Sequence, residues 1–273
     1  MIRNITSLGE KEARLIINLR TAGKTVFDFS DAERASSERN ARNIAQMLYA
    51  LTKKGWLKRL EKGKYIILPF EAGEDRDYTA HEFIIAAHLV KPYYIGFRSA
   101  LNYYGFTEQI SKTVYVVTDR QKKSLELEGT VFQFVKFRQE KQFGITNITI
   151  DNEKVNISNK EKTIVDCLDR LGYAGGIAEV TKALVMGGQE LELNRLVDYS
   201  SRFGSKALSQ RLGFLLEFTG IASEEVMAMI RNQTGRSYVK LDPMSPERGR
   251  YIARWHLRVN VSDDAIGEWQ VSK

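Results

Sequence analysis

The order of local signals in the first 70 residues constrains the fold more than any other feature of this sequence. An S-x-x-E pattern that begins at Ser7 is typical of a capped helix start, and Gly23 lies where this first helix is expected to end. The β-branched and aromatic segment 26–29 predicts a short strand or an extended turn. A second S-x-x-E pattern at Ser30 predicts a short helix over 31–35.

A third helix with one apolar stripe follows, and then a hairpin. Either Ser36 or Ser37 is expected to cap this helix, and Gly55 is expected to end it. Segments 56–60 and 64–68 predict two short strands joined by a basic, glycine-containing turn. Three helices followed by a β-hairpin are the order of a winged helix-turn-helix. The residues that recur at helical spacing in the third helix are Ala41, Ile44, Ala45, Leu48 and Leu51.

The net charge of the chain lies entirely in this N-terminal segment. Residues 1–70 contain 14 Lys and Arg against 7 Asp and Glu, and the rest of the chain contains 27 of each kind, so the net charge of +7 belongs to the first quarter. A basic head on a neutral body suits a polyanionic partner, because each neutralised phosphate releases counterions. A solvated basic face that binds nothing is the alternative explanation of the same charge.

The third helix and the hairpin hold the predicted contacts with double-stranded DNA. A helix supported on its apolar side enters the major groove with its N-terminal residues first, where Arg recognises guanine and Asn recognises adenine. Basic residues at a hairpin tip reach neighbouring phosphates and position the domain. A winged helix that contacts only protein is the alternative. Arg39, Arg42 and Asn43 are expected in the leading turns of the third helix. The predicted DNA-binding residues are Ser37, Arg39, Arg42, Asn43, Lys53, Lys62 and Lys64.

The segment 71–77 is acidic, contains glycine and predicts a linker between two domains. The winged helix-turn-helix is expected over 1–70 and a larger domain over 78–273. This larger domain begins with alternating helix and strand patterns and becomes helical from Ser158 onwards. The expected fold class is therefore α+β, with an N-terminal winged helix-turn-helix followed by a mixed α/β domain whose C-terminal half is helical.

Three segments of the larger domain resemble AbiEi-type antitoxins, which are also described as predicted transcriptional regulators. The first segment spans 93–109 and reads Tyr-Tyr-Ile-Gly-Phe-Arg-Ser-Ala-Leu-Asn-Tyr-Tyr-Gly-Phe-Thr-Glu-Gln. The second is Ser158-x-x-Glu161-Lys162-Thr163-Ile164-x-Asp166, followed by Gly175-Gly176. The third is Trp255-His256-Leu257-Arg258-Val259-Asn260. The resemblance spans nearly the whole chain, including the basic head, whose counterpart in the family is a winged helix that binds its own promoter.

The resemblance implies a bacterial or archaeal component of a type IV toxin–antitoxin system. Such a chain would bind its own promoter, at inverted repeats, and repress its own operon. Its functional partner would be a nucleotidyltransferase-like toxin encoded beside it, which it counteracts without forming a stable complex. This partner biology follows from the resemblance, and neither composition nor spacing implies it.

A second basic group lies near the end of the sequence. Arg250, Arg254 and Arg258 are four residues apart, so a helix would place them on one face. A strand expected over 255–259 competes with this helix, and in a strand Arg254 and Arg258 would still point the same way because their separation is even. We expect this group to contribute to neutralisation of the toxin or to a second nucleic-acid contact. The alternative is a surface group that pairs with acidic residues.

No constellation of residues in the sequence predicts an enzyme, a metal site or a cofactor. A restriction-type nuclease needs an acidic residue followed two positions later by lysine, and no Asp or Glu of this chain has that lysine. His81 and His88 are expected to be ordinary surface or core histidines, and Cys167 a buried apolar residue. Two alternatives to a DNA-binding regulator therefore remain. One is an inhibitor that contacts a toxin or an RNA without binding DNA, and the weaker one is a metal-dependent nuclease.

The sequence also predicts a compartment. No apolar run approaches the roughly 20 residues of a membrane-spanning helix, and the N-terminus lacks the apolar stretch of a signal peptide. A single cysteine excludes an internal disulfide. We therefore expect a cytoplasmic protein without a membrane partner.

Overall fold

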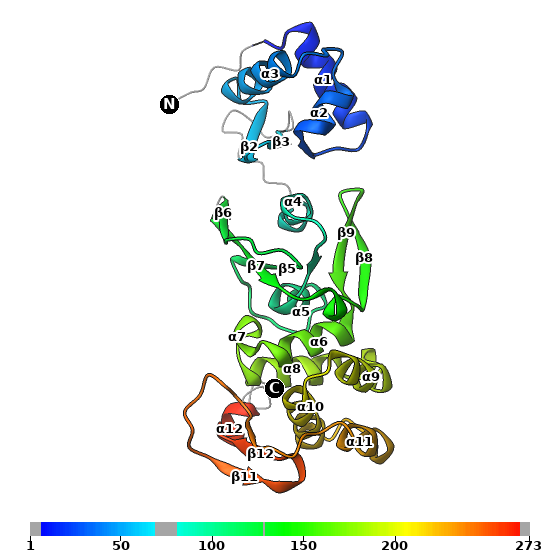
Figure 1. Cartoon of the computed structure of the whole chain (residues 1–273), viewed down its shortest axis with the longest axis vertical. Helices are drawn as coiled ribbons and strands as arrows, with labels where there is room; N and C mark the ends of the chain where they lie inside the picture. The colour runs from blue at the N-terminus through cyan, green and yellow to red at the C-terminus, as the bar shows by residue number, and fades with distance from the viewer. Residues whose placement is uncertain (1–6, 69–80, 128, 268–273) are drawn as a thin grey trace. The chain divides into compact units, whose positions relative to one another are not determined.

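The chain is a mixed α/β protein with open sheets, as its sequence predicts at this level (Figure 1). The computed structural model describes residues 7–68, 81–127 and 129–267. Within these ranges, each helix is too short or too polar to cross a membrane.

The chain divides into two compact units. The first unit extends from residue 1 to residue 91 and also includes 126–130 and 148–155, and the second unit contains the rest. The predicted linker 71–77 lies outside the described residues. The observed division differs from the predicted boundary, because helix α4 (Glu82–Leu89) belongs to the first unit.

The N-terminal part of the first unit contains three helices and a three-stranded sheet of order β1-β3-β2, in which both pairs are antiparallel. Its core is a cluster of buried apolar side chains that includes Leu15, Phe27 and Trp56. The elements in chain order are α1 (Glu10–Thr21), β1 (Val26–Asp28), α2 (Phe29–Ala35), α3 (Ala41–Lys53), β2 (Leu57–Glu61) and β3 (Lys64–Ile67).

All three helices begin at residues other than the predicted serines. The N-cap of α1 is Gly9, whose N–H donates to the Glu12 side chain, and the N-cap of α2 is Asp28, whose side chain accepts from the Asp31 N–H. The N-cap of α3 is Asn40, so neither predicted serine caps this helix. Several residues in each segment are able to cap a helix, and the serine patterns alone do not determine which one does.

The predicted apolar stripe of α3 is partly wrong. Ile44, Leu48 and Leu51 are buried, but Ala41 and Ala45 are exposed. Alanine is compatible with either side of a helix, because its single methyl group buries little apolar area. The predicted hairpin is confirmed as β2 and β3.

The second major feature is a six-stranded sheet of order β6-β7-β5-β4-β9-β8. Strands β5 and β7 run parallel, β4 is antiparallel to β5, and β4 is parallel to β9. Helix α5 (Phe97–Tyr103) follows β4. The strands are β4 (Tyr94–Ile95), β5 (Thr113–Thr118), β6 (Leu125–Leu127), β7 (Thr130–Lys136), β8 (Ile145–Ile150) and β9 (Glu153–Ser158).

The predicted helical C-terminal half is confirmed. Helix α6 lies at its centre and contacts α5, α8, α9 and α10 (Figure 1). Ile164, Cys167 and Leu168 of α6 are fully buried, which confirms the expectation that Cys167 is a buried apolar residue. The helices are α6 (Lys160–Asp169), α7 (Leu171–Ala174), α8 (Ile177–Gly187), α9 (Leu193–Phe203), α10 (Lys206–Thr219) and α11 (Glu224–Arg231).

A small sheet of order β10-β12-β11 and a short helix, α12 (Asp263–Ile266), end the described chain. The strand expected over 255–259 is shorter than predicted, because Trp255 lies in a 3₁₀ turn, η4 (Ala253–Trp255). The Trp255 side chain is fully buried and packs over Gly213 of α10. The strands are β10 (Val239–Lys240), β11 (Arg250–Ile252) and β12 (Leu257–Val259).

We predict that Gly213→Ala destabilises the protein. Alanine in place of glycine inside a helix ordinarily stabilises by about 1 kcal/mol. At this position the added methyl group would overlap the six-membered ring of Trp255. Overpacking of a core costs about 1–3 kcal/mol, so the midpoint of urea unfolding should fall.

Gly172→Ala is the matched control. Its methyl group would meet only the end of the Met244 side chain, which is 72% exposed and free to move. This variant should be neutral or slightly stabilising. A Gly213→Ala protein as stable as the Gly172→Ala control would contradict the close packing of Trp255.

Candidate functional site

The N-terminal end of α3 presents polar side chains to solvent. Asn40 caps the helix by accepting the N–H of Arg42 at 2.9 Å. Arg42 and Asn43 lie in the first turn, and both are exposed. Arg39 is also exposed but lies before the helix, as does Ser37, so the prediction that Arg39 is in the leading turns is wrong. The turn between α2 and α3 therefore holds two of the seven predicted contacts, the helix holds Arg42, Asn43 and Lys53, and the hairpin holds the remaining two.

An acidic residue lies in the same turn. One oxygen of Glu38 accepts the N–H groups of Arg39 and Asn40, each at 3.1 Å, and Lys11 pairs with the other at 3.5 Å. The Asn40 N–H, together with a hydrogen bond from the Asn43 side chain, lowers the pKa of Glu38. Glu38 is therefore ionised at neutral pH, and Asn43 is already engaged in the free protein.

Apart from Lys58, the described cations of the N-terminal part fall into two groups. One group pairs with carboxylates: Lys11, Arg14, Lys24, Arg34, Lys54 and Lys64. The other group forms no ion pair with any residue that the structure describes: Arg20, Arg39, Arg42, Lys53, Arg59 and Lys62. Apart from Arg20, the second group lies on α3, immediately before it, or on the β2–β3 hairpin. Positive charge without internal compensation therefore concentrates at these two elements.

The two predicted hairpin lysines differ in their surroundings. Lys62 is exposed in the turn. Lys64 pairs with Glu61 at 2.7 Å and donates to the carbonyl of Leu89 at 2.8 Å, so its ammonium group is engaged within the first unit. Lys62 is thus the hairpin lysine that is available to a ligand.

The predicted set of DNA contacts omits several exposed residues on α3 and the hairpin. Tyr49 is 64% exposed, and the Lys53 ammonium lies 5.6 Å from the centre of its ring. Gln46 and Arg59 are exposed as well. The signal for Tyr49 and Gln46 was their place outside the Ile44–Leu51 stripe, but an exposed tyrosine is hard to distinguish from a core tyrosine by periodicity alone.

The C-terminal arginines each have a partner. Arg250 pairs with Asp263 at 2.7 Å, Arg254 pairs with Glu217, and Arg258 lies 3.6 Å from Glu247 and donates to the Tyr251 hydroxyl. Arg250 lies in β11, Arg254 in η4 and Arg258 in β12, so the three do not share one helix face. This arrangement corresponds to the alternative of an acid-paired surface group, and a role in toxin neutralisation remains a prediction.

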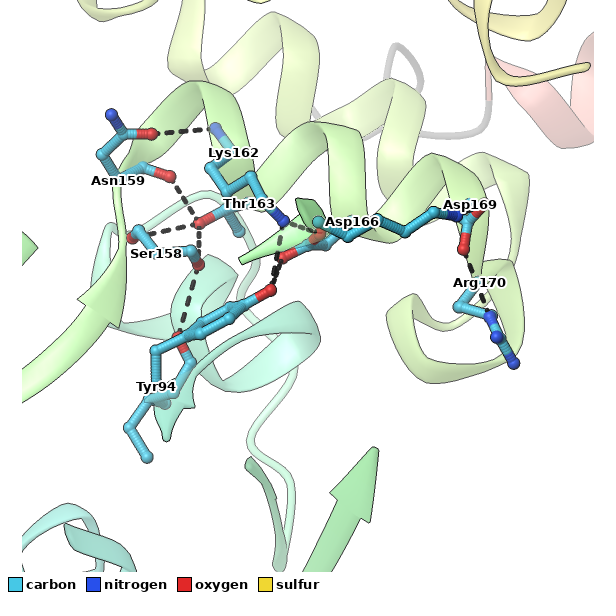
Figure 2. A network of polar contacts seen from close by, with 10 residues as sticks. Tyr94, Ser158, Asn159, Lys162, Thr163, Asp166, Asp169 and Arg170 are labelled. Atoms are coloured by element: carbon cyan, nitrogen blue, oxygen red, sulfur yellow. Dashed lines mark hydrogen bonds and ion pairs between the residues drawn. The ribbon is translucent and has the colours of Figure 1, made fainter. Parts of the chain in front are cut away.

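The second unit contains a buried ionic network that joins two of the segments quoted for the family resemblance (Figure 2). Lys162 and Asp166 of α6 form an ion pair, and both side chains are fully buried. The Tyr94 hydroxyl of β4 donates to Asp166 at 2.9 Å, and the Lys162 ammonium donates to the Tyr94 oxygen at 3.1 Å. The network thus ties the sheet to the central helix of the unit.

Aromatic rings enclose the Lys162 ammonium. Its nitrogen lies 5.1–5.5 Å from the ring centres of Tyr94, Phe137, Phe143 and Phe203. Burial lowers the pKa of Lys162 and raises the pKa of Asp166, and in each case the charge of the partner opposes the effect of burial. Neither group reaches solvent, so the network has no access to a substrate and its role is structural.

The serine of the second segment forms a polar cluster beside this network (Figure 2). The hydroxyls of Ser158 and Thr163 lie 2.7 Å apart, and Asn159 caps α6 by accepting the Lys162 N–H at 2.9 Å. These contacts fix the turn from β9 into α6. Arg98, from the first segment, approaches Gly175 so closely that a side chain there would overlap its guanidinium group.

The histidines and the cysteine have identifiable partners or surroundings. His81 caps α4 through its Nδ1 atom, which accepts from the Phe83 N–H at 3.2 Å, and the Nε2 atom of His88 lies 3.1 Å from Glu153. Burial raises the pKa of the Cys167 thiol well above its ordinary value, so the thiolate is disfavoured. Among the described residues, no group of three or more His, Cys, Asp or Glu side chains is arranged to hold a metal ion.

The comparisons with known proteins define the fold alone. No family model matches the chain, and no curated protein sequence matches it. The structure is similar to the crystal structure of the RV2827C protein from Mycobacterium tuberculosis, with a TM-score of 0.65 and 11% sequence identity. The match covers 100% of this chain and 99% of that one, so the likeness extends over the whole architecture.

We predict that Lys162 and Asp166 are strongly coupled in stability. Lys162→Met or Asp166→Asn should each lower the free energy of unfolding by about 3–5 kcal/mol, because each leaves an unpaired polar group in the core. The double variant should lose clearly less than the sum of the two single losses. Urea unfolding of all four proteins measures this cycle.

The exposed pair Arg14–Glu10 provides a control at the same sequence spacing, since both pairs are four residues apart. Its removal should cost less than about 1 kcal/mol. Similar small losses for both pairs would show that the Lys162–Asp166 pair does not stabilise the core.

Proposed function

We propose that this chain is a DNA-binding transcriptional regulator, in which α2, the following turn and α3 act as a helix-turn-helix and the β2–β3 hairpin acts as its wing. One observation carries the proposal. The cations of the N-terminal part that lack a carboxylate partner among the described residues concentrate on α3, just before it and on the hairpin. Uncompensated cations in this place suit a polyanionic partner, because no internal carboxylate competes with its phosphates.

The packing of α3 supports this use. Ile44, Leu48 and Leu51 hold one side of the helix in the core, and the opposite side presents Arg42, Asn43 and Gln46 to solvent. A helix held in this way presents a rigid set of donors to base edges, and the exposed methyl group of Ala45 suits contact with thymine. Lys62 at the hairpin turn suits a phosphate, which contributes affinity and register without sequence preference.

The resemblance to AbiEi-type antitoxins extends the proposal to the second unit. On this basis the chain represses its own operon from inverted repeats, acts in the cytoplasm, and counteracts a nucleotidyltransferase-like toxin without a stable complex. The segments quoted for the resemblance are the ones that build the core of the second unit, through Tyr94, Lys162, Asp166 and Trp255. The position of these segments in the core supports an architecture shared with that family. The proposal of a toxin partner rests on the resemblance alone.

We predict that Arg42→Ala and Lys62→Ala weaken DNA binding in different ways. Arg42→Ala should weaken binding to promoter DNA by about 1–3 kcal/mol and relax the preference at one base pair, because Arg42 faces the bases. Lys62→Ala should weaken binding to all sequences alike and reduce the salt slope by about 1, because it contacts phosphate. Fluorescence anisotropy on promoter and scrambled duplexes across a salt series measures both.

Arg34→Ala provides the matched control for these variants. Arg34 is an exposed arginine of α2, and it already pairs with Asp31. Its removal should leave promoter binding almost unchanged. If Arg34→Ala loses as much affinity as Arg42→Ala, binding depends on net charge and not on the α3 surface.

We also predict that promoter binding and toxin neutralisation separate. A chain with both Arg39→Ala and Arg42→Ala should lose promoter binding and still restore growth of cells that express the adjacent toxin, because the altered residues lie outside the second unit. Growth curves with and without toxin induction test this. Loss of rescue by a correctly folded double variant would place neutralisation in the N-terminal part.

A further inference from the structure

The second unit contains a cavity of about 550 Å³ that is open to the surface and has a basic lining. Its walls come from the loop after β5, from β7, and from the residues at the end of α6 and in α7. The lining residues that matter here are Lys122, Lys123, Lys136, Arg170, Gln133 and Tyr173. Among the residues that the structure describes, this lining has four cationic side chains and no Asp or Glu.

The topology of the sheet explains why these residues meet. Strands β5 and β7 are parallel neighbours, and their last pair is Thr118 with Lys136. The loop that carries Lys122 and Lys123 leaves the carboxyl end of β5, so it lies at the same edge of the sheet as Lys136. Ligands of open sheets with parallel strands bind outside the carboxyl ends of those strands.

Three of the four cations, Lys123, Lys136 and Arg170, are weakly compensated by the residues that the structure describes. Arg170 lies 3.2 Å from Asp169, but Asp169 also lies 3.8 Å from Lys141 and is thus shared between two cations. Lys123 and Lys136 form no ion pair with a residue in the described part of the chain. Outside the first 70 residues the sequence has 27 basic and 27 acidic residues, so this concentration of positive charge is local.

The aromatic walls are rigid. The ring of Tyr173 packs edge-on against Phe97 at 5.2 Å and lies 5.4 Å from Tyr115, which fixes its position. The Lys122 ammonium lies 4.9 Å from the centre of the Phe134 ring. The cavity therefore combines mobile cations with fixed ring surface, which suits a ligand that is anionic at one end and flat at the other.

We propose that this cavity binds a free nucleoside triphosphate, with the phosphates on Lys122, Lys123, Lys136 and Arg170 and the base toward Tyr173. The volume lies within the roughly 300–1,000 Å³ of small-molecule sites. Lysine binds phosphate as a point charge, and arginine binds it through two parallel donors. The site is independent of the DNA surface proposed for α3. It would give the chain a small-molecule ligand, which the sequence did not predict.

Isothermal titration calorimetry at low ionic strength tests the proposal. The full chain is titrated in turn with ATP, GTP, CTP and UTP. At least one triphosphate should bind saturably with one site per chain, and the affinity should fall as salt is added. The variant with both Lys123→Gln and Lys136→Gln should bind at least tenfold more weakly. Both side chains are exposed, so thermal melting should show an unchanged fold.

Lys112→Gln is the control variant. Lys112 is an exposed lysine that precedes β5, at the opposite end of the strand from the cavity. This variant, and Arg42→Ala of α3, should bind the triphosphate as the unaltered chain does. Retained binding by Arg42→Ala together with loss by the Lys123/Lys136 variant supports a site separate from the DNA surface.

Three outcomes would overturn the proposal. The first is the absence of saturable binding by all four triphosphates at millimolar concentration. The second is an equal loss of affinity in Lys112→Gln, which would indicate general charge attraction. The third is binding of a short single-stranded oligonucleotide that excess triphosphate fails to displace, which would make this edge of the sheet a nucleic-acid surface.

Discussion

The buried ion pair between Lys162 and Asp166 is the interaction on which the second unit depends most. Removing two charged groups from water costs free energy. A buried ion pair offsets this cost only where further hydrogen bonds satisfy the remaining donors and acceptors. Here Tyr94 supplies that completion from the sheet, since its hydroxyl contacts both partners. Moving β4 relative to α6 would leave two ionisable groups unsatisfied in a core of aromatic rings. The network therefore specifies one register between sheet and helices, which apolar packing alone would leave less strictly defined.

This register also determines the geometry of the basic cavity. Helix α6 carries the network along its length and ends at Asp169, so Arg170 and the following Tyr173 are placed by the same helix. The other walls belong to the loop after β5 and to β7, and in the sheet β5 lies between β4 and β7. Tyr94 pairs with Val117 one residue before the end of β5. A structural network without access to solvent thus holds a neighbouring surface in a defined shape, which is how a rigid interior supports a ligand site.

The sequence predicted the helices and strands better than it predicted the contacts between residues far apart in the chain. The hairpin and the helical half follow from local periodicity and turn residues, and both are present in the structure. The helix caps were misplaced because Gly9, Asp28 and Asn40 compete with nearby serines on nearly equal terms. Lysine and aspartate four residues apart ordinarily form a surface pair, so spacing gave no sign that Lys162 and Asp166 are buried. The cavity depends on the parallel pairing of β5 with β7, which is a long-range contact without a local signal.

Glu38 opposes binding to DNA at the start of α3, and its presence there has a physical explanation under the proposed function. Its carboxylate lies among the polar residues that lead into α3, where it would repel a phosphate placed without regard to sequence. The same group holds the Asn43 side chain in the free protein. A base edge that offers Asn43 a better pair of hydrogen bonds compensates for the lost contact with Glu38, whereas a wrong base does not. An acid at this point therefore weakens non-specific affinity more than specific affinity, and selectivity arises from that difference.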